Sequence, residues 1–456
     1  MRRLLLATPF LPLIAIAVTL PPATMRVSAA APAEPTFNKD VLPILQRNCQ
    51  ECHRPGAIAP MSFVTYKDTR PYAKAIEKAV LAKTMPPWGA DPTVGHFRNE
   101  RRLNQSDIDT LSAWATKGAI EGSEKDKPAP IVFNDGWTIG KPDIIVSYPH
   151  PVDIPATGIW EQSNLVVKAH FDHDMWVKAA EVKPGNPKVV HHMKAWIRPP
   201  NSNWLKNAPD GEIYRPQRGD GSDGQAPEPQ FTGNGPRPVQ DILAKYNPGV
   251  EGQPFDTGDA AKFIAAGSDI VFEIHYATTG KPETDQSAVG IVLADHAPRF
   301  RHLTTTAISS RGFAIPPGDS NYEVKDQTTL QADVDLVWIQ PHMHYRAKDF
   351  ILRAVYPSGE TKTIVNVPRY SFNWQIGYEL SEPVKLPKGT RLETVTHYDN
   401  SAANKSNPDP TLTVRYGAQT TDEMNVSFVG VILDVKADPM RIFARPGRGP
   451  VGPAVE

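Results

Sequence analysis

The only two cysteines of the 456-residue chain lie in the string Cys49-Gln-Glu-Cys52-His53. This C-x-x-C-H spacing is the attachment motif of a c-type haem, in which both thiols form thioethers and the histidine is the proximal iron ligand. A zinc site would want two further Cys or His residues nearby. A thioredoxin-like dithiol would be expected within a βαβ pattern. The motif therefore predicts one covalently bound redox haem.

A methionine in the string Thr84-Met85-Pro86-Pro87-Trp88 is a candidate for the sixth ligand of that haem iron. Met85 lies at the end of an expected helix and before a loop that two prolines restrain. A thioether opposite a histidine favours reduced iron and raises its potential, which suits electron transfer. The alternative is that Met85 fills the hydrophobic core, as most methionines do.

Two pairs of histidines have the spacing of metal ligands. His342 and His344 are two residues apart in an extended run, so both imidazoles lie on one face of a strand and can reach one metal. His191 and His192 are adjacent, so a regular strand would point them to opposite faces. Their joint ligation requires a bulge or the use of different ring nitrogens. Cross-strand packing or a surface pair is the alternative for both.

Helical spacing of apolar residues predicts the elements that position the haem motif, over residues 36–122. Leu42 and Leu45 indicate a first helix that runs into C-x-x-C-H. Pro71 is expected to open a second helix, and Ser106 resembles the N-cap of a third. Three short helices around a haem are the plan of a small cytochrome c, and the region resembles class I cytochromes c.

Beyond residues 123–136, a charged linker that contains prolines, the pattern changes to period two. Runs such as 143–148, 164–168 and 269–276 indicate strands of antiparallel sheets. Residues 201–254 are rich in Pro, Gly and Asp and lack strand alternation, so we expect a long excursion there. It either covers a functional site or forms a surface loop.

The order of four short strings over residues 137–436 carries a resemblance to a known family. His191-His192-Met193 comes first, then Ile274-His275-Tyr276, then the His-x-His pair, and finally Asp422-Glu423-Met424. This order resembles that of the copper type II, ascorbate-dependent monooxygenases, the family of peptidylglycine α-hydroxylating and dopamine β-monooxygenases. The joint order is fairly specific, whereas each string alone is weak.

The resemblance implies two copper ions with unlike ligands. One copper would be held by His191, His192 and His275, and the other by His342, His344 and the thioether of Met424. In the family, the all-His copper stores and passes an electron, and the other copper binds dioxygen and hydroxylates a C–H bond. Three imidazoles suit a copper that cycles between two oxidation states, while a soft sulfur biases the second copper toward Cu(I).

The resemblance also implies the fold class, which is multidomain α + β. A small all-α cytochrome c domain would be followed by two antiparallel, jelly-roll-like β-sandwich domains that face each other across a solvent-filled cleft. The expected parts are a signal peptide 1–30, the cytochrome c domain 36–122, the linker 123–136, the sandwiches 137–297 and 298–438, and a disordered tail 439–456.

The chain departs from the family in ways that bear on substrate and reductant. The peptide-amidating branch grips a carboxylate with an Arg, an Asn and a Tyr, whose places are taken here by Gln340, Val426 and Phe428. A small, less charged organic molecule is therefore the expected substrate, together with O₂. Both cysteines are committed to the haem, so no disulfide staples the sandwiches. A fused haem domain would replace or supplement an ascorbate-like reductant with a periplasmic electron donor.

The start of the chain predicts export. Met1-Arg2-Arg3 is a positive region, residues 4–20 are largely apolar, and Val27-Ser28-Ala29 offers a cleavage site, which together indicate a secretory signal. An N-terminal anchor helix is the alternative. A net charge of -1 gives no reason to expect nucleic acid or an anionic membrane as a partner. No later segment has the length of apolar residues that stable membrane insertion needs. We expect a periplasmic or secreted protein.

Two functions from different classes follow from these motifs. The first is an exported copper-dependent monooxygenase whose electrons are relayed from the fused haem to the copper sites. The alternative is a non-catalytic electron-transfer or copper-binding protein on the same scaffold. A simple ligand-binding module beside a cytochrome would leave the six ordered ligands without an explanation.

Overall fold

The computed structural model describes residues 34–133, 136–160, 162–215, 236–247, 252–255, 258–417 and 419–444. The predicted signal peptide and the last twelve residues of the predicted tail, 445–456, lie outside the described residues. No helix in these ranges is both long and apolar enough to cross a membrane. Residues 35–456 form one unit by their internal contacts.

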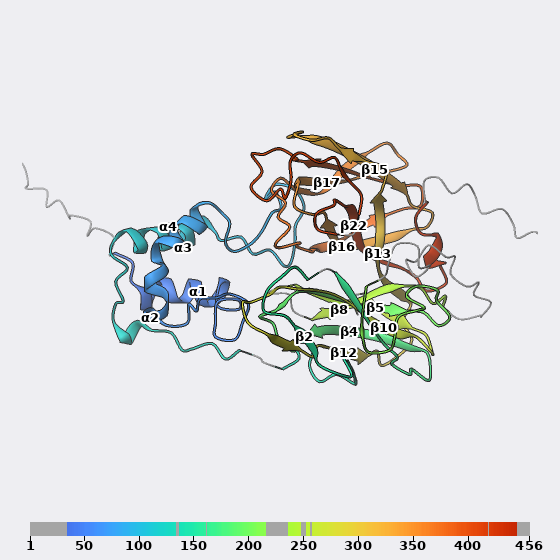
Figure 1. The fold of residues 1–456 in the computed structure, drawn as a ribbon, viewed down its shortest axis with the longest axis horizontal. Coiled ribbons are helices and arrows are strands. Elements are labelled where there is room, and N and C mark those ends of the chain that lie inside the picture. Colours follow the sequence, from blue (N-terminus) through green and yellow to red (C-terminus); the bar gives the residue numbers. More distant parts are fainter. Residues whose placement is uncertain are drawn as a thin grey trace, which may run out of the picture. The chain divides into compact units, whose positions relative to one another are not determined.

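The helices gather at the start of the described chain. They are η1 Phe37–Val41, α1 Leu42–Asn48, α2 Tyr66–Thr69, η2 Arg70–Tyr72, α3 Ala73–Leu81, α4 Gln105–Thr116 and η3 Glu124–Asp126, with a late turn η4 at Pro439–Arg441 (Figure 1). Helix α1 ends with Cys49 at its C-cap, so a helix does run into the C-x-x-C-H motif as the sequence predicts. Phe37, Leu45 and Trp114 lie in a core of their own between these helices.

Two predicted helix starts are corrected. The N-cap of α4 is Asn104 rather than Ser106, because the Asn104 side chain accepts a hydrogen bond from the Asp107 backbone N–H at 2.8 Å. Ser106 lies inside the first turn and donates to Asn104 instead. Pro71 lies within the 3₁₀ turn η2, so it precedes the α-helical segment α3 and does not open it.

Strands form the rest of the regular secondary structure, in several sheets. They are β1 Ile144–Ser147, β2 Val152–Ile154, β3 Ser163–Val167, β4 Met175–Lys183, β5 Val190–Arg198, β6 Ile213–Tyr214, β7 Asp241–Tyr246, β8 Gln253–Pro254, β9 Ala260–Ile264, β10 Asp269–Tyr276, β11 Glu283–Asp285, β12 Ala288–Leu293, β13 Phe300–Ser310, β14 Ala314–Ile315, β15 Tyr322–Thr329, β16 Val334–His342, β17 Ala347–Val355, β18 Thr361–Val367, β19 Tyr378–Leu386, β20 Arg391–Tyr398, β21 Val414–Arg415 and β22 Asn425–Asp434.

Each half of this β region has two sheets around its own core. In the first half, the run β1-β12-β4-β9 accompanies the five-stranded sheet β6-β3-β10-β5-β7. Phe272 and Ile291, from the two sheets, are both buried in one hydrophobic cluster. In the second half, the run β13-β22-β16-β19 accompanies the four-stranded sheet β15-β20-β17-β18. Phe350 and Val429, again from the two sheets, share a separate cluster.

Strands β9 and β13 pair in parallel and join the two halves into one nine-stranded sheet. A fully buried ion pair accompanies this junction: Lys262 on β9 donates to Asp241 on β7 at 2.7 Å. Thr304 on β13 donates its backbone N–H to the same Asp241 oxygen. Removing one partner of such a pair leaves a buried charge and typically costs about 3–5 kcal/mol. The pair therefore helps to fix the junction.

Strand β7 corrects the expectation that residues 201–254 lack strands. It hydrogen-bonds β5 at the edge of the five-stranded sheet, and five of its six residues are buried. Leu243 packs in the core of the first half, and Ile242 packs in a second cluster with Trp338. A strand that is buried on both faces does not alternate between apolar and polar residues, so the alternation test misses it.

A stretch within the predicted helical domain packs against the second half of the β region. The Arg98 backbone donates to the Glu379 carbonyl at 2.9 Å, and Phe97 forms an isolated bridge with Leu380. Trp88 and Phe97 are buried members of the second half's core. The chain thus leaves the helical core after α3, contacts the β region, and returns to form α4.

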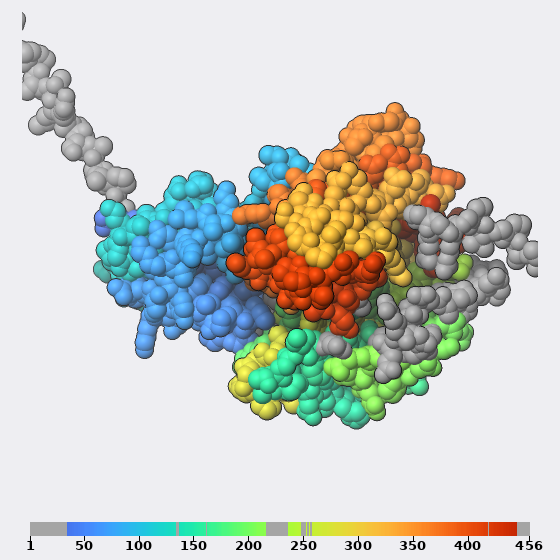
Figure 2. All heavy atoms as spheres, turned by 45° about the horizontal axis from the view of Figure 1, so that its top comes forward, coloured from blue at the N-terminus to red at the C-terminus, as the bar shows by residue number. Residues whose placement is uncertain are grey.

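The segment that follows β20 crosses the surface of the second half. It lies beside residues 316–319, because the Asn400 backbone donates to Asp319 and the Gly318 backbone donates to Pro410. Figure 2 shows these two stretches next to each other on one face, in yellow and red. Asn400 itself is fully buried and accepts a hydrogen bond from the Arg346 guanidinium at 2.9 Å. This contact fixes the chain just beyond His344.

Candidate metal centres

The first histidine group depends on an irregularity in the pairing of β5 with β10. His275 pairs with His192, whereas the next residue, Tyr276, pairs with Val190. His191 is therefore an extra residue on β5 that opposes no partner, which is a β-bulge. Of the two alternatives expected for adjacent histidines, a bulge or the use of different ring nitrogens, the bulge is present. The bulge turns His191 toward the same side as His192 and His275.

The three imidazoles of this group are close enough to share one metal. Their ring centroids are separated by 5.3 to 5.6 Å. One ligand nitrogen from each lies within 4.8 Å of the others. Burial lowers the pKa of His191, and it lowers that of His192 well below its usual value. Burial, with His191 and His344 nearby, lowers the pKa of His275 to about 4. All three rings are thus neutral at pH 7, the form that binds metals.

The second histidine group lies at the end of β16. The rings of His342 and His344 are 5.4 Å apart and almost perpendicular, in agreement with the prediction that both project from one face. His342 Nδ1 lies 2.7 Å from the Gln375 side-chain oxygen. His344 Nδ1 lies 3.2 Å from the Asp422 carbonyl. Because each Nδ1 is the donor to an oxygen, each Nε2 carries the lone pair that a metal needs.

The Glu423 carboxylate connects the backbones of the residues that form the second group. This carboxylate is fully buried and accepts backbone hydrogen bonds from His344 at 2.8 Å, Arg346 at 2.6 Å and Met424 at 3.3 Å. One oxygen accepts from both His344 and Met424, so these two residues lie side by side although they are distant in the sequence. Burial raises the pKa of Glu423 to about 7. The backbone of the predicted methionine therefore lies next to that of His344.

Both histidines of the second group are also neutral at pH 7. Burial, followed by the nearby Lys194 ammonium, lowers the pKa of His342 well below its usual value. Burial lowers the pKa of His344 to about 4. Lys194 on β5 is paired with Glu273 at 2.8 Å and lies between the two halves, where its charge also disfavours protonation of His192. The two groups thus share one electrostatic environment.

Three positions that differ from the peptide-amidating branch lie close to the second group and carry no cation. Gln340 is buried and donates to the Gln375 carbonyl at 2.5 Å. Val426 and Phe428 belong to a buried cluster between the halves, and the Phe428 ring lies 6.0 Å from the His342 ring. Val426 and Phe428 are apolar, and the cation beside them is the Lys194 ammonium, which lies 4.5 Å from the Phe428 ring centroid and is paired with Glu273.

The gap between the two groups contains an aromatic side chain. The resemblance implies a solvent-filled cleft there, but the Phe372 ring centroid lies 6.1 Å from that of His191 and 6.0 Å from that of His344. Phe372 belongs to the segment between β18 and β19, which also contains Gln375. Neither residue is indicated by any motif in the sequence.

The C-x-x-C-H motif forms a turn at the end of α1. Cys49 and Cys52 are free thiols one helical turn apart, since the Cys52 backbone donates to the Cys49 carbonyl at 3.2 Å. His53 stacks on Phe63 with 4.3 Å between ring centroids. Its Nδ1 lies 3.3 Å from the Met61 carbonyl, which leaves Nε2 for a metal. These residues fit a covalently bound haem.

Met85 is half-buried in the loop that follows α3. Together with Val80, Leu103 and Ile108 it lines a pocket of about 290 Å³ at the side of the helical core. The pocket is apolar on this side, as a haem face requires. Among the described contacts, none joins Met85 to His53, so its ligation to a haem iron stays a prediction.

Comparisons with known proteins identify no family. No protein-family model matches the sequence, and no curated protein matches it either. The solved structures that match include T=1 particles derived from infectious bursal virus, with 8% identity, 66% of this chain and 72% of that chain covered, and a TM-score of 0.16. The infectious bursal disease virus Gt strain matches with 10% identity, 69% and 77% coverage, and a TM-score of 0.14. Scores this low support no statement about the fold or function of this chain.

Proposed function

We propose that this protein is an exported copper-dependent monooxygenase that hydroxylates a C–H bond of a small organic molecule, with electrons delivered through a fused c-type haem domain. The proposal combines the C-x-x-C-H motif with two metal-binding groups in one chain. It also uses the ligand order, which resembles that of copper type II monooxygenases.

The observation that carries the proposal is the difference between the two groups. The first consists of three neutral imidazoles whose ligand atoms lie within 4.8 Å of one another. The second consists of His342 and His344 with Met424 beside them, where Glu423 accepts from the backbones of His344 and Met424. A protein that only stores copper would need no second group with a softer, sulfur ligand. Two unlike groups suit an oxygenase that separates electron storage from oxygen chemistry.

The proposed reaction balances with an external reductant. One C–H bond, one O₂, two electrons and two protons give one C–OH bond and one water. Copper bound at the two groups would supply one electron from each, with the softer second group as the place where dioxygen is met. The electrons come from a periplasmic one-electron donor, or from an ascorbate-like reductant, and not from the substrate alone.

The protein's own residues keep the ligands ready for metal. Burial keeps the five histidines neutral, so no proton has to leave before a metal binds. Gln375 and the Asp422 carbonyl fix the tautomers of His342 and His344. Phe428 and Val426 present apolar surface beside the second group, so an uncharged substrate is favoured over a carboxylate.

Metal and haem quantitation on protein produced in a periplasm tests the proposal. The wild type is expected to contain two coppers and one haem. His275→Ala should lose about one copper from the first group, and Met424→Ala should lose about one from the second, because each variant removes one ligand from a different set. Haem-loaded protein without copper affinity would refute the oxygenase and leave an electron carrier.

Rapid mixing of fully reduced protein with oxygen tests the electron relay. Haem oxidation, followed by its absorbance, should proceed in step with product formation when substrate is present. A haem that stays reduced during turnover would exclude the relay while leaving the copper assignment in place.

The second candidate is a non-catalytic electron-transfer or copper-binding protein. One observation favours it, namely that the Phe372 ring contacts both histidine groups and so occupies space a substrate would need. The two candidates differ in product: an electron carrier forms no hydroxylated product in the presence of O₂ and a reductant, whereas an oxygenase incorporates one oxygen atom of O₂ into each product molecule.

A further inference from the structure

Phe372 contacts histidines of both metal-binding groups. Its ring is roughly parallel to that of His191, with 30° between the planes, and stands edge-on to that of His344, at 88°. Tyr345, the neighbour of His344, packs against the same ring at 4.6 Å. Among the ring contacts of the described residues, no other side chain pairs with a histidine of each group.

A short turn presents Phe372 to the two groups. The backbones of Trp374 and Gln375 both donate to the Ser371 carbonyl at 3.2 Å, which closes a turn over residues 371–374. Ser371 and Asn373 are exposed, so the turn lies at the surface while the Phe372 ring is half-buried. The turn thus reaches the histidines through the Phe372 ring and also through the Asn373 backbone, which shares a hydrogen bond with His191.

The turn is anchored at both ends. Before it, the Tyr370 hydroxyl donates to the Met343 carbonyl at 2.7 Å and accepts from the Met343 backbone at 3.1 Å. After it, the Gln375 side-chain oxygen accepts a hydrogen bond from His342, and the Gln375 backbone carbonyl accepts one from the Gln340 side chain. Gln375 has a positive φ of 39°, a conformation that non-glycine residues keep only when their contacts enforce it. Any movement is therefore confined to residues 371–374.

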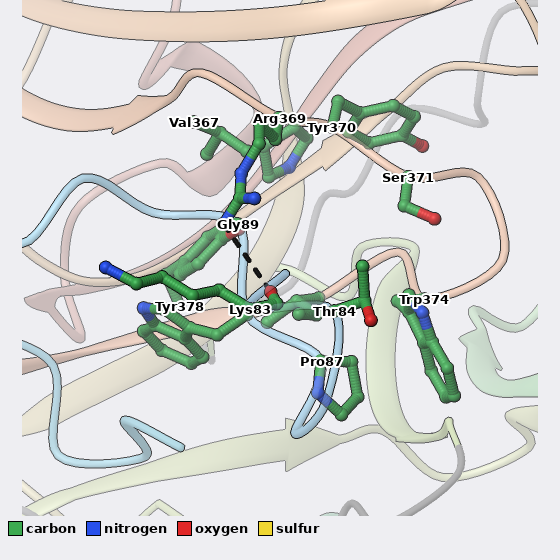
Figure 3. A pocket seen from close by; sticks show the side chains of 13 residues that line it. Lys83, Thr84, Pro87, Gly89, Val367, Arg369, Tyr370, Ser371, Trp374 and Tyr378 are labelled. Atoms are coloured by element: carbon green, nitrogen blue, oxygen red, sulfur yellow. Dashed lines mark hydrogen bonds between the residues drawn. The ribbon is translucent and has the colours of Figure 1, made fainter. Parts of the chain in front are cut away.

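There is room for this turn to withdraw. Ser371 and Trp374 line a pocket of about 180 Å³, together with Thr84 and Pro87 from the loop after α3. Figure 3 shows Thr84 and Pro87 on one side of this pocket and Ser371 and Trp374 on the other. Phe372 does not line it, since its ring points to the histidines instead. A space that could hold several water molecules thus lies on the other side of the turn.

We propose that Phe372 is a stopper between the two histidine groups, and that the turn 371–374 must withdraw before an organic substrate reaches His344 and Met424. This inference rests on the proposed function, because the molecule that is admitted is the substrate of that reaction. The structure corresponds to the closed form, in which the ring takes the place of the molecule to be oxidised. Phe372 then decides which molecules enter by their size, and it is a specificity-determining residue.

Two variants of the turn should differ in how far they expose the histidines. Without the ring, His191 and His344 lose an apolar cover and become accessible to small reagents. Trp374 belongs to the same turn but lines the pocket, so Trp374→Ala removes an aromatic side chain from the turn and leaves the Phe372 ring over both histidines. Phe372→Ala and Trp374→Ala are therefore a matched pair that separates the stopper from a general loosening of the turn.

Carbethoxylation of the metal-free protein by diethyl pyrocarbonate, located by mass spectrometry, tests the proposal. Phe372→Ala should raise the modification rates of His191 and His344 several-fold, while Trp374→Ala should leave them near the wild-type rates. His173 is exposed and distant from the turn in the sequence, and it provides an internal reference that should not change. Equal rates at His191 and His344 in the wild type and Phe372→Ala would overturn the stopper, as would an equal rise in both variants.

A second variant keeps the test decisive if Phe372→Ala unfolds. Phe372→Leu retains an apolar side chain but loses the ring, so a smaller rise at the same two histidines is expected, and no rise would contradict the proposal. These rates are measured without metal, whereas copper content decides the proposed function. If the wild type binds no copper but the variants show the predicted modification rates, the oxygenase is refuted and Phe372 still covers the histidines. If the wild type binds two coppers but the modification rates do not change, the stopper is refuted and the oxygenase stands.

Discussion

The two histidine groups reach similar ligand geometries by different means. In the first, the backbone positions the ligands: an extra residue in β5 opposite β10 turns three imidazoles to one side. In the second, polar contacts position the ligands: the buried Glu423 carboxylate accepts from three backbone N–H groups, the Gln375 side chain holds His342, and the Asp422 backbone carbonyl holds His344. A bulge in a central pair of strands is rigid, whereas a site at a strand end needs added polar contacts.

This difference suits the proposed division of labour. A group that only stores and passes an electron benefits from a fixed geometry, because little rearrangement is then needed when its charge changes. A group that meets oxygen and substrate has to leave one side open, and here that side faces the Phe372 turn. Mutation of the residues that support the second group should therefore affect that group and spare the first.

Glu423→Ala should have the largest effect. Two buried backbone donors and one partly buried donor lose their acceptor, and each unsatisfied donor costs about 1–3 kcal/mol, so the free energy of unfolding should fall by about 3–9 kcal/mol. Denaturant unfolding measures this loss. Copper analysis of the protein that still folds should show the second copper missing and the first retained.

Glu323→Ala is the matched control for that change. Glu323 is an exposed glutamate on β15 that pairs with Lys325, and its removal should change stability by no more than about 0.5 kcal/mol. The account of the second group would be contradicted if Glu423→Ala were as mild as this control, or if it removed the first copper and spared the second.

Gln375→Leu should weaken the second group without unfolding the protein. His342 loses the oxygen that fixes its Nδ1–H, and removing such a partner typically lowers metal affinity about 10–100-fold. Competition with a copper chelator measures the affinity of each group. Gln375→Glu keeps an acceptor oxygen and should lie closer to the wild type. Equal copper affinities in Gln375→Leu and the wild type would mean that Gln375 does not position His342.

The pH dependence of stability should be shared by both groups. Burial lowers the pKa of His275 and of His344 to about 4, while unfolded histidines titrate near pH 6.5. Between these values the unfolded chain binds more protons, so the metal-free protein should lose stability as pH falls from 6.5 toward 4. Glu423, whose pKa is raised to about 7, acts in the opposite direction but is a single group.

Melting temperatures of the metal-free protein between pH 7.5 and 4.5 check this trend. His275→Asn and His344→Asn should each make the fall shallower, because each removes one buried group that resists protonation. A melting temperature that stays constant or rises as the pH is lowered would show that these histidines are not buried in the neutral form.

The sequence predicts the ligands better than their supports. Adjacent His191 and His192 already require a bulge, and the His342/His344 spacing already requires a shared face, because both follow from the two-residue period of a strand. In the sequence, Glu423 is recognisable only as a member of the string Asp422-Glu423-Met424. Its supporting role was not predictable, because it arises from hydrogen bonds to residues almost eighty positions away. Phe372 and Gln375 carry no local pattern, and their contacts exist only after the sheets have paired.

The fold shows the same division between local and distant information. Helix α1 and the alternating strands are local features and were predictable. Strand β7 was missed because both of its faces are buried. The packing of Trp88 and Phe97 in the second β half was also missed, since an apolar residue in a loop does not reveal which core it will join.

Anomalous diffraction at the copper absorption edge, from crystals of copper-loaded protein, tests the central claim most directly. The account predicts two peaks. One lies among His191, His192 and His275, and the other lies among His342, His344 and Met424. A single peak, or copper bound away from these six side chains, would contradict the assignment of two unlike copper groups.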